Sequence, residues 1–65
     1  MPILRAEAQF PIPPNAWHAL NSINGVREIR EEAHSYDIII DDPAKIESII
    51  KEARTLGLDV IEQLQ

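Results

Sequence analysis

Histidine and aspartate are the side chains of this chain best suited to metal binding, and neither is grouped as a metal site requires. His18 and His34 fall in different predicted elements, whereas a zinc site gathers three or four ligands around one point. Asp41 and Asp42 form a carboxylate pair suited to calcium or magnesium, but the spacing of a calcium-binding loop does not follow. We therefore expect surface histidines and no metal site.

Nucleophilic catalysis has no better basis in the sequence. Serine and threonine occur singly, and there is no glycine-rich loop of the kind that cradles a phosphate. Because cysteine is absent, thiolate metal sites, cysteine nucleophiles and disulfides are excluded. We expect a protein that is not an enzyme and has no catalytic residues and no cofactor.

The charge balance argues against nucleic acid as a partner. Lys and Arg number 6 against 11 Asp and Glu, which gives a formal net charge of −5. Nucleic-acid binding requires a basic face that displaces counterions from phosphates, and one Phe, one Tyr and one Trp make a poor platform for stacking bases. An acidic surface keeps a small protein soluble and suits a basic protein partner.

Length and hydropathy predict one small soluble domain over residues 1–65. No apolar run is long enough to span a bilayer, and residues 1–5 lead into a strand pattern instead of a signal peptide. We therefore expect a cytoplasmic protein that does not bind membranes.

The strongest local pattern predicts an amphipathic helix over residues 43–57. Asp42 is a good N-cap, Pro43 suits the first helical position, and Gly57 suits the left-handed conformation that ends a helix. Apolar residues recur at three- and four-residue steps on one face: Ile46, Ile49, Ile50, Ala53 and Leu56. This apolar stripe requires a sheet or a second helix to cover it.

Alternation of apolar and polar residues predicts strands over residues 4–10, 36–41 and 58–64. The last of these places Leu58, Val60 and Leu64 on one face and Asp59, Ile61 and Gln63 on the other. Residues 26–32 read as a further strand, in which Val26 and Ile29 are out of phase unless a bulge or a late start intervenes. A helix over residues 14–23, with Trp17 bordering its apolar side, follows the proline-rich residues 11–14.

The predicted order is βαββαβ. Right-handed crossovers and a central hairpin then give an α+β, ferredoxin-like sandwich: a four-stranded antiparallel sheet of order 4-1-3-2 with both helices on one face.

The chain also resembles the heavy-metal-associated domain family of copper and zinc chaperones. The resemblance extends over nearly the whole chain and is carried by Ala16, Leu20, Ile23, Gly25, Val26, Ile29, Asp42, Pro43, Ala53, Gly57, Leu58, Asp59 and Val60. The family's metal-binding Cys-x-x-Cys pair would fall near Gln9 and Ile12, which cannot bind a soft metal ion. The resemblance therefore implies the fold without the family's metal site.

Two apolar surface features remain as candidate interaction sites. The first is the sheet face away from the helices, with Ile3, Ile39 and Ile61. The second is the rim of the proline-rich loop, with Phe10, Ile12 and Trp17. The alternative for the sheet-face residues is incidental exposure, and the alternative for the rim residues is a hydrophobic lid over the end of the core.

These features favour a small non-enzymatic protein-interaction module that acts as a homodimer or as a subunit of a larger assembly. The alternative is a thiol-free domain of the metal-chaperone type that senses a small ligand or a hard metal ion in the loop between Phe10 and Asn15. A third hypothesis is an acidic protein that occupies the nucleic-acid-binding site of a basic partner. An acylphosphatase-like enzyme is the least favoured reading, because no arginine-bearing phosphate loop follows the first strand.

Overall fold

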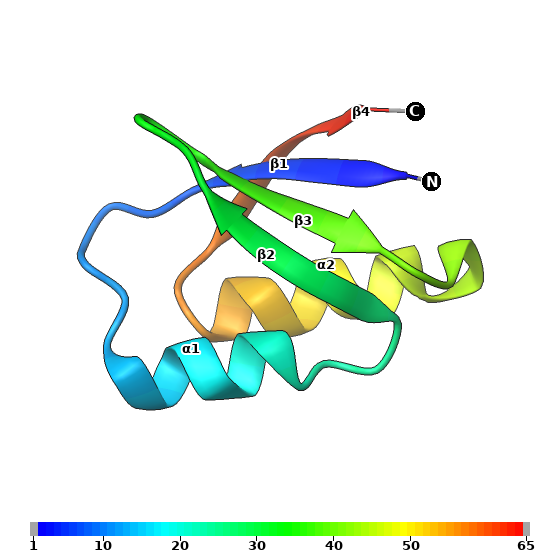
Figure 1. Ribbon diagram of the computed structural model, residues 1–65, viewed down its shortest axis with the longest axis horizontal. Coiled ribbons are helices and arrows are strands. Elements are labelled where there is room, and N and C mark those ends of the chain that lie inside the picture. Colours follow the sequence, from blue (N-terminus) through cyan, green and yellow to red (C-terminus); the bar gives the residue numbers. More distant parts are fainter. Residues whose placement is uncertain (1, 65) are drawn as a thin grey trace.

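The computed structural model describes residues 2–64, which form four strands and two α-helices (Figure 1). The elements in chain order are β1 (Ile3–Glu7), α1 (Pro14–Asn21), β2 (Val26–Glu31), β3 (Tyr36–Ile40), the 3-10 turn η1 (Pro43–Lys45), α2 (Ile46–Thr55) and β4 (Asp59–Leu64). This order is the predicted one. The first strand ends at Glu7, well before Phe10, and the first helix ends at Asn21, two residues before Ile23.

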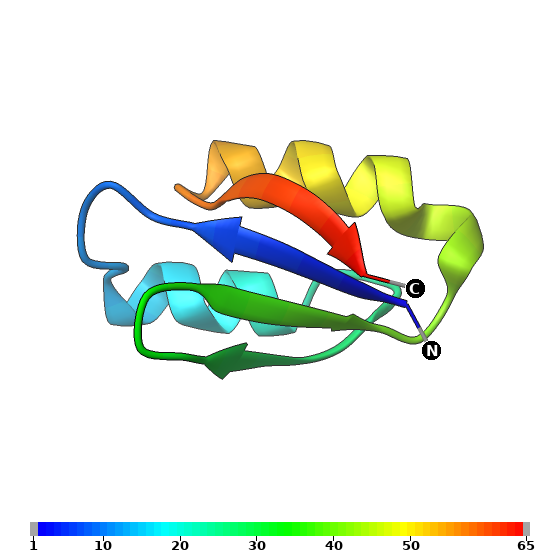
Figure 2. The ribbon, with the colours of Figure 1, turned by 90° about the horizontal axis from the view of Figure 1, so that it is seen from above.

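The strands form one antiparallel sheet of order β2-β3-β1-β4, which is the expected order seen from the other edge. Figure 1 shows both helices below the sheet, and Figure 2 looks down onto the strands from the opposite side. The sheet therefore has an inner face covered by α1 and α2 and an outer face that neither helix covers. We use the names inner face and outer face in this sense throughout.

The core lies between the inner face and the helices. Its buried side chains are Leu4, Ala6, Leu20, Ile23, Ile38, Ile40, Ile49, Ala53 and Leu58. In the apolar stripe of α2, Ile49 and Ala53 are buried, while Ile46, Ile50 and Leu56 are half-buried and pack against this cluster. Each fully buried Leu or Ile contributes about 1.5–3 kcal/mol relative to exposure, so the stripe holds the helix on the sheet.

The residues predicted to bound the second helix do so. Asp42 Oδ1 accepts a hydrogen bond from the Ala44 amide at 3.1 Å, although the first turn is 3-10 instead of α-helical. At the other end, Gly57 has a φ of +105°. The Gly57 amide donates to the Arg54 carbonyl and the Leu58 amide donates to the Ala53 carbonyl, which is the Schellman arrangement of a helix C-terminus.

Two bulges set which side chains reach each face. In β2, Val26 pairs with Ile40 and Ile29 pairs with Ile38, so a bulge between Val26 and Glu28 brings both apolar residues to the inner face. This confirms the expected irregularity.

The second bulge was not expected. Val60 lies opposite Ala6 and Glu62 lies opposite Arg5, so Ile61 is an extra residue in β4. Beyond it the alternation reverses and Leu64 lies opposite Ile3 on the outer face. The prediction that Leu64 shares a face with Val60 is therefore wrong.

Candidate interaction surface

A row of four charged residues crosses the outer face. Arg30 on β2 lies opposite Asp37 on β3, Asp37 lies opposite Arg5 on β1, and Arg5 lies opposite Glu62 on β4. Side chains of directly opposed residues on neighbouring strands lie on the same face of a sheet. The signs along this charged row therefore read plus, minus, plus, minus from one edge of the sheet to the other.

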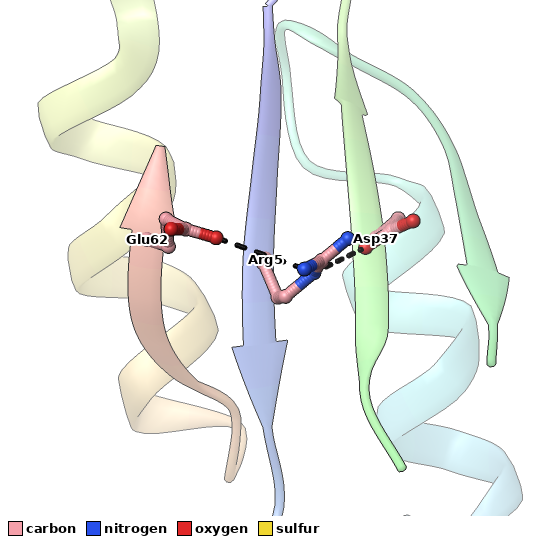
Figure 3. A network of polar contacts seen from close by, with 3 residues as sticks. All are labelled: Arg5, Asp37 and Glu62. Carbon is pink, nitrogen blue, oxygen red and sulfur yellow. Dashed lines mark ion pairs between the residues drawn. The ribbon is translucent and has the colours of Figure 1, made fainter. Parts of the chain in front are cut away.

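Arg5 is the centre of two ion pairs within the charged row (Figure 3). Its Nε lies 3.6 Å from Asp37 Oδ1, and its Nη1 lies 3.7 Å from Glu62 Oε1. Both distances exceed the roughly 2.7–2.9 Å of a charge-assisted hydrogen bond. Arg5 Nε and Asp37 Oδ1 are both buried and have no hydrogen-bond partner within the described residues. Arg5 Nε is thus shielded from solvent, and the accessible part of the guanidinium lies elsewhere on this 42% exposed side chain.

Solvent exposure differs along the charged row. The side chain of Asp37 is 16% exposed and that of Arg5 is 42% exposed. Arg30 and Glu62 at the edges are more exposed, and Arg30 Nη2 pairs with Glu28 Oε1 on its own strand at 3.2 Å. Exposed pairs of this kind contribute little to stability.

An apolar row runs beside the charged row. Its apolar members, in order across β3, β1 and β4, are Ile39, Ile3 and Leu64, and Glu28 occupies the corresponding position on β2. Ile39 is only 7% exposed although it lies on the outer face, and Ile3 and Leu64 are half-buried. Ile39 is absent from the cluster packed between sheet and helices, so it belongs to a second, shallow apolar layer on this face.

The three isoleucines predicted to mark this face do not lie in one row: Ile3 and Ile39 do, and Ile61 does not. Ile3 and Ile39 are a direct cross-strand pair, as a shared surface requires. Ile61 is 54% exposed at the β4 bulge, and Leu64 takes the position beside Ile3. The sequence offered no signal for Leu64, because residues on both phases of the last strand are apolar.

The three rim residues do not form a single patch. Phe10 is 78% exposed, whereas Ile12 and Trp17 are half-buried and pack against the core. The Trp17 ring meets the ring of Tyr36 edge-on, with 5.4 Å between centroids and 62° between planes. Phe10 is therefore the member of this set that is available to a partner.

A groove of about 320 Å³ lies beside Phe10. Its lining consists of Gln9, Phe10, Pro11, Ile12, Pro13, Arg54, Leu56, Gly57 and Asp59. Arg54 and Asp59 border it, so a small polar ligand in this groove could contact both a cation and a carboxylate. A second groove, of about 450 Å³, runs between α1 and α2 past Ile23, Lys45 and Leu56.

Metal-ligating side chains do not converge anywhere in the described part of the chain. No group of three or more His, Cys, Asp or Glu residues within 2–64 is placed to hold an ion. His18 and His34 are both exposed, on α1 and in the turn between β2 and β3. The Asp42 carboxylate is engaged as the cap of η1.

Comparisons with protein-family models, with curated proteins and with solved structures found no match for this chain. None of the helices within residues 2–64 has the length and apolar character needed to cross a membrane. Inference about function therefore depends on the geometry of the surfaces described above.

Proposed function

We propose that this chain is a small non-enzymatic protein-interaction module with a ferredoxin-like fold, and that the outer face is its contact surface. The fold assignment is supported by the βαββαβ element order, the strand order and the position of both helices on one face. The likeness of its framework positions to metal-chaperone domains supports descent from that type, without its metal site.

One observation carries the assignment of the surface: an apolar row and a row of alternating charges lie side by side on the uncovered face. Apolar side chains provide the favourable burial on association. Charges determine which partner is accepted and in what orientation. Arg5, whose side chain is 42% exposed, adds a partly accessible positive charge at the centre of the sheet.

Site-specific photo-crosslinking in cells that express the protein tests this proposal. A benzophenone amino acid replaces Glu28, which is exposed on the outer face, and in a matched control it replaces Glu47, which is exposed on α2. We expect a covalent protein adduct from position 28 and none from position 47. Equal yields at the two positions, or no adduct at either, would contradict the proposal.

The alternative is a sensor that binds a small ligand or hard metal ion in the groove beside Phe10. It is favoured by one observation: the groove lies between the proline-rich loop and the turn from α2 to β4, and Arg54 and Asp59 border it. Calorimetric titration with zinc, copper, nickel and common metabolites tests it. Heat of binding that disappears in Asp59→Asn for a metal ion, or in Arg54→Ala for an anionic metabolite, would support the sensor, and no heat across the panel would eliminate it.

A further inference from the structure

We infer that the partner of the outer face is a second copy of this chain, related by a two-fold axis parallel to the strands between β3 and β1. This inference rests on the proposed function, because it names the occupant of the same surface. It is carried by the order of charges in the charged row. That order is complementary to itself when it is reversed.

A two-fold axis parallel to the strands reverses the row when two outer faces meet. Arg30 then faces Glu62 of the second copy, and Asp37 faces Arg5 of the second copy. Because a two-fold contact is reciprocal, the same pairs recur on the other side of the axis, and all four positions meet opposite charges.

The other in-plane axis gives the reverse result. A two-fold axis perpendicular to the strands and through the charged row would place Arg5 against Arg5 and Asp37 against Asp37. The same axis moved between the two rows would place Arg5 against Ile3 and Asp37 against Ile39, which sets charges against apolar side chains. Like charges brought together at an interface oppose association. The charged row therefore selects one of the two symmetric ways of stacking these sheets.

The centre of the apolar row agrees with the selected axis, whereas at its ends Glu28 lies against Leu64 of the second copy. Reversal places Ile39 against Ile3 of the second copy, and Ile3 against Ile39, at the centre of the contact. The partly exposed guanidinium of Arg5 then lies opposite Asp37 of the second copy. Sheets that pack face to face keep their strands within about 30° of each other, which this arrangement allows.

The size of the face predicts a weak dimer. Four strands at about 4.8 Å spacing and about 17 Å length cover roughly 350 Å² on each copy. The pair would bury about 700 Å², less than the roughly 1,200 Å² at which standard stable interfaces begin. We therefore expect dimers at high micromolar to millimolar protein, and monomers on dilution.

Sedimentation equilibrium with charge-reversed variants tests the axis. Arg30→Glu places two glutamates against each other, and Glu62→Arg places two arginines against each other. We expect the dimer dissociation constant of each variant alone to be about tenfold higher than that of the wild type. In an equimolar mixture of the two variants every edge contact regains opposite charges, so we expect affinity within about threefold of the wild type.

The mixture also separates association from folding. Each variant carries the same change within its own chain whether alone or mixed, so restored association cannot come from restored folding. A wild type that stays monomeric at millimolar concentration would overturn the inference. So would variants that associate as strongly as the wild type, which is the result expected if two copies pair instead through the edge of β4. If sedimentation shows no dimer but position 28 crosslinks to a different protein, the proposed function stands and only the dimer is rejected. If sedimentation shows no dimer and position 28 gives no crosslink, both the dimer and the proposed function are rejected.

Discussion

Arg5 and Asp37 lie directly opposite each other on the two central strands, with Arg5 Nε 3.6 Å from Asp37 Oδ1 and neither atom hydrogen-bonded to any residue from 2 to 64. The pair satisfies the charge of each group without satisfying its hydrogen-bonding capacity. Such a pair contributes modestly to the fold, and the 42% exposed side chain of Arg5 remains partly accessible to a partner.

Removing the charge of Asp37 should destabilise the isolated chain slightly. Asp37→Asn keeps the shape of the side chain but takes the carboxylate away from the buried Arg5 Nε, so we expect a loss of about 0.5–1 kcal/mol in unfolding free energy. Urea denaturation measures it. Glu62→Gln is the matched control, because Glu62 is more exposed and its pair with Arg5 should contribute less. An equal or larger loss in the control would show that Asp37 is not the principal partner of Arg5.

The two glycines with positive φ should differ in their tolerance of alanine. Gly25 has a φ of +99° and Gly57 a φ of +105°. Alanine at either position should therefore lower the unfolding free energy by about 1–2 kcal/mol through backbone strain alone. At Gly25 an added Cβ would also lie 3.1 Å from Lys45 Cβ and 3.2 Å from Ile49 Cδ1, whereas at Gly57 the nearest atom, Ile12 Cδ1, is 3.6 Å away. Gly25→Ala should therefore melt at a lower temperature than Gly57→Ala, and the reverse order would argue against the described packing of η1 and α2 on this turn.

Burial of α2 on the sheet is tested by removing one methyl group. Ile49 is fully buried, so Ile49→Val should cost about 0.5–1.5 kcal/mol. The half-buried Ile50 provides the comparison, and Ile50→Val should cost less. Chemical denaturation distinguishes the two, and a cost at position 50 that equals or exceeds the cost at position 49 would place the helix in a different rotation.

Truncation of Phe10 and of Trp17 should change the unfolding free energy by different amounts, although both residues border the same loop. Phe10→Ser should change the unfolding free energy by less than about 0.5 kcal/mol, because its side chain is largely exposed. Trp17→Ala removes an aromatic contact with Tyr36 and packing against the core, so we expect a loss of about 1 kcal/mol or more. Thermal melts followed by circular dichroism compare them, and a destabilised Phe10→Ser would show that the loop closes over this ring in solution.

Sequence periodicity was sufficient for the order of elements, because the cap at Asp42, the terminator at Gly57 and the alternating strands each act through local chemistry. It also indicated an irregularity in β2, since Val26 and Ile29 are out of phase, but left a bulge and a late strand start as alternatives, and the strand pairing shows the bulge. The β4 bulge left no such sign, because Val60, Ile61 and Leu64 are apolar on both phases of the strand.

The candidate surface was harder to predict for the same reason. Which charges line up across four strands depends on the register of every pair, and each bulge shifts that register. The sequence pointed to Ile3 and Ile39 on the outer face, but Leu64 and the charged row of Arg30, Asp37, Arg5 and Glu62 became visible only once the strands were paired.

The most direct test of the central claim is a dilution series followed by two-dimensional amide NMR spectra, from millimolar protein down to tens of micromolar. If two copies meet through the outer face, concentration-dependent shifts should concentrate at Ile3, Arg5, Asp37, Ile39 and Leu64, while amides of the exposed side of α2 stay constant. Shifts confined to the helices or to the loop around Phe10, or spectra that do not change across the series, would contradict this account.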